Sequence, residues 1–147
     1  MKAEAPRLLE SAYPEFIRIT TRFGDMDFNG HLNNVAFAQF FEDARVSFNR
    51  KLIFSDDIHP DSRDYRVLVA SVEIAYVREG YYGPDVTVGI GVKRLGRSSF
   101  ELGAAVFQDG HCLAVHDSTV VYKGVAEGMP ARARAALESK MLILPGA

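Results

Sequence analysis

The sequence predicts an α+β domain in which an antiparallel sheet of about five strands wraps around one long helix. Segments of alternating apolar and polar residues lie on both sides of a stretch that runs from Arg22 to Leu52, and such alternation is typical of strands. In the part of this stretch that follows the loop of residues 24–34, an apolar stripe recurs at helical spacing and consists of Phe37, Phe40, Phe41, Ala44, Phe48 and Leu52. Four phenylalanines on one face need a large covering surface, which a curled sheet provides.

Length, charge and cysteine content narrow the class of protein. A chain of 147 residues fits a single domain spanning 1–147. The formal charge of −2, with both signs interspersed, gives no electrostatic case for binding nucleic acid or an anionic membrane. The single Cys112 excludes an internal disulfide and suits a reducing cytoplasm. Residues 1–14 contain no continuous apolar run, so we expect neither a signal peptide nor a membrane span.

The strands are expected in a definite order. A first strand is predicted at Phe16–Phe23, with Ile17, Ile19 and Phe23 on one face. Ser55–Asp64, which includes His59 as a solvated residue, is expected to form a loop that edges the site. Four strands in a meander are then predicted at Val67–Val77, Val86–Arg94, Phe100–Phe107 and His111–Tyr122.

Finer features follow from individual residues in this part of the chain. In the second strand, one face is expected to carry Leu68, Ala70, Val72, Ile74 and Tyr76. Asp109-Gly110 is a strong signal for a tight hairpin. Gly89 and Gly91 leave one face of their strand bare, as a bulge or a close neighbour requires. Pro130–Leu144 shows a weak helical pattern, with Pro130 suited to the first turn.

The polar loop of residues 24–34 leads directly into the start of the long helix. A helix start carries roughly half a positive charge and several unpaired N–H groups, so it can stabilise a carbonyl oxygen that develops negative charge. Asn33 or Asn34 is expected to be the N-cap. Asp27, Asn29 and His31 alternate just before it and can supply a nucleophile or base, an orienting hydrogen bond and a proton carrier. Turn formation alone also explains such residues.

The ordered residues of this loop carry a family resemblance. The stretch from Asp25 to Asn34, followed by Phe37, Glu42 and Ala44-Arg45, resembles the start of hotdog-fold thioesterases of the 4-hydroxybenzoyl-CoA thioesterase type. Its D-x-D-x-N-x-H-x-N-N pattern is similar to that of plant acyl-carrier-protein thioesterases, and the resemblance extends over roughly Phe16 to Tyr122. It implies a hotdog fold and a homodimer, or a tetramer of dimers, with the active site at the dimer interface.

Two further segments are singled out by the resemblance. Tyr76-Val77-Arg78-Glu79 matches a segment whose glutamate is associated with the site, so Glu79 is a candidate catalytic residue, although a glutamate at a strand end is usually solvated. Lys93–Phe100 spans a turn where basic side chains can reach the phosphates of coenzyme A or of a phosphopantetheine arm. The resemblance implies arm contacts there, and the candidate residues are Arg94, Arg97 and Ser98.

Together these observations favour an acyl-thioester hydrolase acting on acyl-CoA or acyl-carrier-protein substrates. Asp27 is expected to act as a nucleophile that forms a mixed anhydride or as a general base for water, and the sequence does not separate the two roles. Asn29 and His31 are expected to position the carboxylate or the substrate. Backbone N–H groups at Leu32, Asn33 and Asn34 are expected to polarise the thioester carbonyl.

Two other functions are compatible with the same residues, whereas several other chemistries are not favoured by the sequence. A hotdog dehydratase or hydratase acting on enoyl thioesters would also use Asp and His near a helix start, and a non-catalytic acyl-CoA-binding protein would keep the cleft without the chemistry. There is no G-x-S-x-G motif, and Cys112 is expected to be a small buried residue. We expect no cofactor and no metal, because Asp25, Asp27 and His31 have no further ligand group nearby in the sequence.

Overall fold

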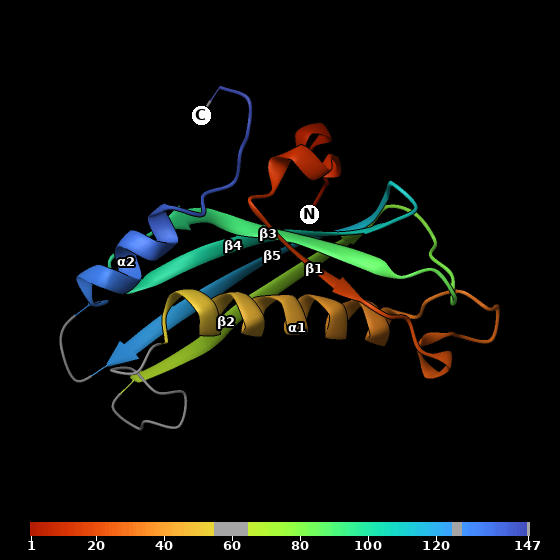
Figure 1. Cartoon of the computed structure of the whole chain (residues 1–147), viewed down its shortest axis with the longest axis horizontal. Coiled ribbons are helices and arrows are strands. Elements are labelled where there is room, and N and C mark those ends of the chain that lie inside the picture. Colours follow the sequence, from red (N-terminus) through yellow and green to blue (C-terminus); the bar gives the residue numbers. More distant parts are fainter. Residues whose placement is uncertain (55–64, 125–127, 147) are drawn as a thin grey trace.

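The structure, a computed structural model, describes residues 1–54, 65–124 and 128–146. In these residues five strands form one antiparallel sheet, and they are β1 (Glu15–Ile19), β2 (Tyr65–Tyr76), β3 (Val86–Leu95), β4 (Ser99–Gln108) and β5 (His111–Gly124). The long helix α1 (Asn34–Leu52) lies along one face of the sheet, and α2 (Ala131–Glu138) follows the last strand (Figure 1). Short 3-10 helices occupy Ala5–Leu8, Glu10–Ala12 and Phe23–Asp25. The predicted hotdog architecture of a sheet around one long helix is confirmed.

The core forms where α1 meets the sheet. All six residues of the predicted apolar stripe are buried, and they pack with inward-facing residues of β3, β4 and β5 such as Val88, Leu102 and Val120. Burial of each phenylalanine contributes roughly 2 kcal/mol. The predicted long helix between the loop of residues 24–34 and Leu52 is therefore confirmed, and the burial of its apolar stripe is the reason that was given for it.

The strand order corrects the predicted meander. Only β3, β4 and β5 follow one another, because the sheet order is β1-β3-β4-β5-β2. The long helix carries the chain across the face of the sheet, so β2 joins the edge opposite β1 and pairs with β5. The prediction that four consecutive strands form a meander is wrong for β2.

Two details of the predicted strands differ in the structure, namely the end of β1 and the faces of β2. β1 ends at Ile19, and Phe23 lies in a 3-10 helix with its ring exposed instead of on the strand face. In β2 the register shifts between Val69 and Ser71. Because such a bulge exchanges the two faces, Val72, Ile74 and Tyr76 share a face as predicted, but Leu68 and Ala70 do not.

The predicted hairpin, the buried cysteine and the last helix are all present in the structure. The Asp109-Gly110 hairpin is confirmed, with both residues at positive φ (51° and 79°). Cys112 is buried as expected, and burial raises the pKa of its thiol to about 11. The helix predicted within Pro130–Leu144 is present as the shorter α2, Ala131–Glu138, and Pro130 lies at the N-cap position, one residue before the first turn in which it was expected. The predicted loop Ser55–Asp64 with His59 lies outside the described residues.

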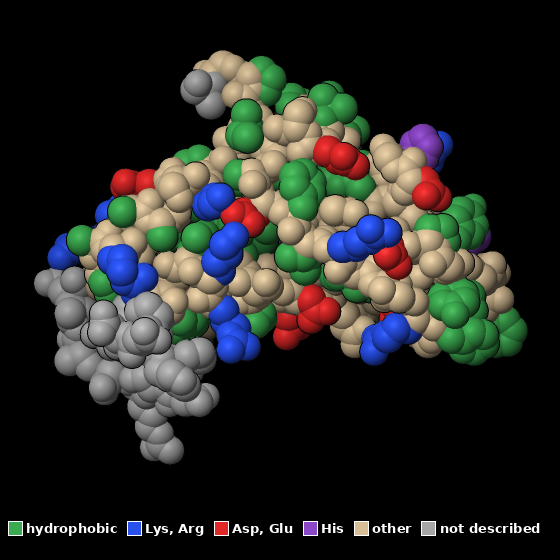
Figure 2. Space-filling model, in the orientation of Figure 1, with side chains coloured by type: hydrophobic (Ala, Val, Ile, Leu, Met, Phe, Trp, Pro, Cys, Tyr) green, Lys and Arg blue, Asp and Glu red, His purple; other side chains and the backbone are tan. Residues whose placement is uncertain are grey.

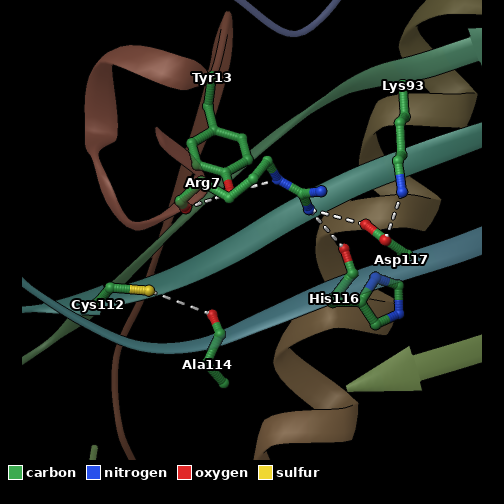
Figure 3. A network of polar contacts seen from close by, with 7 residues as sticks. All are labelled: Arg7, Tyr13, Lys93, Cys112, Ala114, His116 and Asp117. Carbon is green, nitrogen blue, oxygen red and sulfur yellow. Dashed lines mark hydrogen bonds and ion pairs between the residues drawn. The ribbon is translucent and has the colours of Figure 1, made fainter. Parts of the chain in front are cut away.

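The N-terminal segment covers the outer face of the sheet, opposite α1. Arg7 is buried, and its guanidinium donates to the carbonyl of His116 (3.2 Å) and to Oδ1 of Asp117 (2.8 Å), while the Tyr13 hydroxyl donates to the Arg7 carbonyl (2.7 Å) (Figure 3). Lys93 reaches the second oxygen of the same Asp117 at 2.8 Å. Both cations keep the pKa of Asp117 below its ordinary value despite burial, which raises it.

The glycines of β3 make room for this covering segment. A Cβ atom at Gly89 would lie 2.7 Å from Cγ of Tyr13, and one at Gly91 would lie 2.6 Å from Cδ of Pro14. The sequence left open a bulge or a close neighbour, and the structure shows the close neighbour.

Gly91→Ala should lower the free energy of unfolding by about 2 kcal/mol, because the rigid Pro14 ring cannot move aside without loosening the N-terminal segment. Urea unfolding of the purified variant measures this loss. Gly24→Ala is the matched control, since a Cβ atom there would meet no other atom within 4 Å. Equal stability of the two variants would show that the N-terminal segment does not pack on β3.

Candidate functional site

The loop between β1 and α1 is folded around the carboxylate of Asp27. Its Oδ1 accepts hydrogen bonds from the backbone N–H groups of Asn29 (2.8 Å) and His31 (3.1 Å), and the Asp27 N–H donates to the His31 carbonyl (2.7 Å). Gly30 permits this turn because its φ is +78°. Oδ2 makes no hydrogen bond with any described residue, so one carboxylate oxygen is fixed and the other is open.

The segment after β2 holds the loop in place. The Leu32 N–H donates to the Gly80 carbonyl (2.8 Å), and His31 forms an antiparallel bridge with Tyr81. Gly80 must lack a side chain, because a Cβ atom would lie 2.6 Å from Leu113 and 2.8 Å from Leu32. This contact brings together two segments that are about fifty residues apart in the sequence.

His31 and Glu79 meet across this contact. Nε2 of His31 lies 3.2 Å from Oε2 of Glu79, and the imidazole packs edge-to-face on the Tyr81 ring with 5.1 Å between centroids. The carboxylate of Glu79 can therefore hold a proton on Nε2 and orient the ring. Glu79 is largely exposed, yet it is directed at a predicted site residue.

Asp25, which begins the motif shared with the family, has a structural role in the loop. It is 2% exposed, and its carboxylate accepts hydrogen bonds from the backbone N–H (2.8 Å) and the guanidinium (3.1 Å) of Arg22. Its carbonyl accepts from the Asn33 N–H (2.8 Å). Asp25 thus supports the loop, and changing it would disturb the fold.

The start of α1 presents fewer free donors than expected. Asn33 is the N-cap, and its Oδ1 accepts from the Ala36 N–H at 2.7 Å. The N–H groups of Leu32 and Asn33 are already bound to backbone carbonyls, so neither can polarise a substrate carbonyl in this conformation. The N–H groups of Asn34 and Val35 make no hydrogen bond with a described residue. Of Leu32, Asn33 and Asn34, only Asn34 therefore keeps an N–H group that can donate to a substrate carbonyl. Val35, which the sequence did not single out, offers a second such group.

Exposed apolar side chains surround this end of the molecule. Figure 2 shows hydrophobic side chains gathered where the loop before α1 lies, and the exposed residues there are Phe23, Phe28, Val35, Tyr81 and Tyr82. Gln108 holds Tyr81 in place, because its side-chain amide bonds both the N–H (2.9 Å) and the carbonyl (2.7 Å) of that residue. Sequence reasoning missed Tyr81 and Gln108, although Tyr81-Tyr82 directly follows the segment that contains Glu79.

The predicted basic hairpin lies at the opposite end of the same protomer. In the sheet register Leu68, Val121 and Ser99 lie side by side at one end, whereas Tyr76, Ala114 and Val106 lie side by side near the Asp27 loop. A ten-residue strand separates the two ends by roughly 30 Å. Within one chain, Arg94, Arg97 and Ser98 are therefore not brought to Asp27. Lys93, which belongs to the same predicted cluster, is bound to Asp117.

In residues 1–54, 65–124 and 128–146, no helix is long and apolar enough to cross a membrane. No group of three or more His, Cys, Asp or Glu side chains in these residues is arranged to hold a metal ion.

Comparison with known proteins places this geometry in a family. Residues 21–141 match the thioesterase-like superfamily. The fold is similar to the PA5185 protein of Pseudomonas aeruginosa strain PAO1, with a TM-score of 0.81, 26% identity and coverage of 92% of this chain and 96% of that one. Because the matched family spans most of the chain, the protein belongs to the thioesterase-like superfamily.

Other relatives agree. A predicted thioesterase of Bacillus stearothermophilus has a TM-score of 0.74 at 28% identity, covering 89% of this chain and 98% of its own. A thioesterase of Thermus thermophilus, solved with coenzyme A and Zn, has the same TM-score and identity and covers 87% and 94%. YsmA of Bacillus subtilis (strain 168) is 26% identical over 93 residues, which span 63% of this chain and only 60% of YsmA. The family and these neighbours support thioester hydrolysis in general.

Asn33→Ala should lower the free energy of unfolding by about 1 kcal/mol, because it removes the side chain that caps α1. Asn34→Ala is the matched control and should change stability by less than about 0.5 kcal/mol, since Asn34 is an exposed first-turn residue. Urea denaturation of both variants measures the difference. A larger loss in the Asn34 variant would assign the cap to the wrong residue.

Proposed function

We propose that the protein hydrolyses acyl thioesters at the start of α1, with Asp27 as the reacting carboxylate. The observation that carries the proposal is that Asp27, one carboxylate oxygen of which is open, lies in the loop that leads directly into α1, where the N–H groups of Asn34 and Val35 make no hydrogen bond with a described residue. Apolar side chains border the same place and suit an acyl group.

Either role of Asp27 leads to the same products. As a general base, Asp27 takes a proton from water, the oxygen of that water attacks the carbonyl carbon, and the C–S bond breaks as the thiolate leaves and is protonated. As a nucleophile, Oδ2 attacks the carbonyl carbon and expels the thiolate, and water then hydrolyses the mixed anhydride to a carboxylic acid. The Asn34 N–H stabilises the oxyanion of each tetrahedral intermediate.

The remaining loop residues have positioning roles in this proposal. Asn29 and His31 fix Oδ1 of Asp27 through their backbone N–H groups, so Oδ2 is presented in one orientation. The His31 imidazole, oriented by Glu79, can move a proton to or from the leaving thiolate. The side chain of Asn29 is exposed and free to contact the substrate.

Assembly through the β2 edge would complete the site. β2 pairs with β5 on one side only, and it exposes apolar side chains along its length, among them Leu68, Val69, Val72 and Tyr76. An exposed apolar edge strand is a template for pairing with a second copy. We infer a homodimer in which two β2 strands pair antiparallel, with a tetramer of dimers as the larger form.

Such pairing would bring the basic hairpin of one protomer to the Asp27 loop of the other. β2 begins at the hairpin end and finishes at the loop end, so an antiparallel partner has these ends reversed. Arg94, Arg97 and Ser98 would then contact the carrier. We favour coenzyme A, which is bound in the Thermus thermophilus relative, over an acyl carrier protein.

Asp27→Asn should lower kcat for acyl-CoA hydrolysis about 100-fold or more while leaving the fold intact, because it removes the base or nucleophile. Thiol release measures the rate, and circular dichroism checks the fold. Asp109→Asn is the matched control, since Asp109 is an exposed carboxylate in a turn that asparagine also adopts. Near-normal thiol release by folded Asp27→Asn would rule out this mechanism.

Mixed dimers test the shared site. The Arg94→Ala/Arg97→Ala variant should raise KM for acyl-CoA with little change in kcat, most clearly at low salt, and should leave an N-acetylcysteamine thioester unaffected. Mixing it with Asp27→Asn chains should restore low-KM activity, since one site of each mixed dimer combines a normal Asp27 with a normal hairpin.

If the activity of the mixture is only the sum of the activities of the two variants, each hairpin contributes to the site of its own chain. An equal loss on both substrates would instead show that the hairpin supports the fold.

A further inference from the structure

A buried glutamine at the end of β4 holds the segment that follows β2. Gln108 is the last residue of β4 and is 5% exposed. The tight Asp109-Gly110 turn comes directly after it, so the hairpin fixes its backbone. Its side chain reaches Tyr81 and Pro84, which lie 27 and 24 residues earlier in the sequence. A rigid part of the sheet is thereby connected to a segment without regular secondary structure.

The amide of Gln108 binds both backbone groups of Tyr81. Oε1 accepts a hydrogen bond from the Tyr81 N–H (2.9 Å), and Nε2 donates to the Tyr81 carbonyl (2.7 Å) and to the Pro84 carbonyl (3.0 Å). These three bonds use the oxygen of the amide and both of its N–H groups. The side chain therefore pairs with Tyr81 as a neighbouring strand would, and the position of Tyr81 is set by the end of β4.

On its other edge, Tyr81 faces the loop that contains Asp27. His31 of this loop forms an antiparallel bridge with Tyr81, and the imidazole packs edge-to-face on the tyrosine ring with 5.1 Å between centroids. Tyr81 thus lies between Gln108 and His31. Through it, a side chain that does not belong to the loop supports the His31 imidazole.

The His31 ring depends on this support, because its other side-chain contact is weak. The torsion that turns an imidazole about its Cβ–Cγ bond has only a broad preference, so neighbouring groups decide where the ring nitrogens point. The Glu79 carboxylate lies 3.2 Å from Nε2, but the Glu79 side chain is 67% exposed, and exposed pairs of this kind hold a side chain only loosely. The Tyr81 ring restricts the same torsion from a position that the backbone fixes.

We propose that Gln108 is a positioning residue for thioester hydrolysis, because it fixes Tyr81 and Tyr81 orients the His31 imidazole. This inference rests on the proposed function, in which His31 exchanges a proton with the leaving thiolate. Gln108 does not contact the substrate. Its loss should therefore lower kcat and change KM little, since the ring would be misplaced only for the chemical step.

Thr21 offers a matched control on the same segment. It is 5% exposed, and its Oγ1 accepts from the Gly83 N–H (3.0 Å) and donates to the Pro84 carbonyl (3.2 Å). Thr21 bonds neither backbone group of Tyr81. Thr21→Val and Gln108→Met each remove the buried hydrogen bonds of one side chain and keep a side chain of similar size. A comparison of the two separates the positioning of Tyr81 from a general loosening of the segment.

NMR and steady-state kinetics measure the effect. The ring protons of His31 lie beside the Tyr81 ring, whose ring current shifts their signals, and His31→Gln assigns these signals by removing them. In Gln108→Met the signals should move toward those of a free histidine, and kcat for acyl-CoA hydrolysis should fall on the order of tenfold with KM within about twofold. Thr21→Val should keep the His31 signals and kcat close to those of the wild type.

Gln108→Glu tests the donated hydrogen bonds in a side chain of the same shape. When ionised, the new carboxylate can accept from the Tyr81 N–H but cannot donate to the carbonyls of Tyr81 and Pro84, whereas its protonated form donates one hydrogen bond again. Burial raises the pKa of a carboxyl group, so kcat of this variant relative to the wild type should rise as the pH is lowered from about 8 to about 6.

Three outcomes would overturn the proposal. Unchanged His31 signals in folded Gln108→Met would mean that Gln108 does not orient the imidazole. An equal fall of kcat in Thr21→Val would mean that any loosening of the segment has the same effect. A relative kcat of Gln108→Glu that does not change with pH would mean that the donated hydrogen bonds do not fix Tyr81.

The same experiment separates this proposal from the proposed function. If the wild type hydrolyses no thioester, the proposed function fails. The His31 signals of Gln108→Met and Thr21→Val then still decide whether Gln108 fixes the imidazole, because they are recorded on the protein without substrate.

Discussion

The hydrogen bond from the Leu32 N–H to the Gly80 carbonyl is the contact on which the site depends. It holds the loop before α1 against the segment after β2, and the antiparallel bridge between His31 and Tyr81 supports the same contact. Asp27 and Asn34 lie on either side of Leu32 in the chain. The backbone between them is therefore fixed at more than one point, which is the preorganisation that the proposed oxyanion stabilisation requires.

The two faces and the two edges of the sheet have different roles around the Leu32–Gly80 contact. The N-terminal segment closes the outer face through the buried Arg7–Asp117 pair, while α1 fills most of the inner face. The β2 edge remains apolar and open, so we expect assembly at that edge. The last residues of the same edge lead into the segment that holds the Asp27 loop. Substrate binding and dimer formation would thus share one boundary.

The sequence predicted the elements well, because each is encoded locally. The phenylalanine stripe of α1 and the Asp109-Gly110 hairpin are patterns within a few residues, and both are present. Glu79 was singled out by resemblance, and the structure places it against His31.

Features that depend on contacts between residues far apart in the sequence could not be predicted from it. The position of β2 beside β5 and the bulge at Val69–Ser71 depend on how distant strands pair. The burial of Asp25 depends on the return of the chain at Asn33, and a turn pattern does not reveal it.

The most direct test of the proposed mechanism is a crystal structure of Asp27→Asn with an acyl-CoA bound. We expect the thioester oxygen to accept a hydrogen bond from the Asn34 N–H, at about 2.9 Å, with the carbonyl carbon beside residue 27. We also expect the nucleotide phosphates to lie on Arg94 and Arg97 of the second copy. A thioester carbonyl bound away from the start of α1 would contradict it.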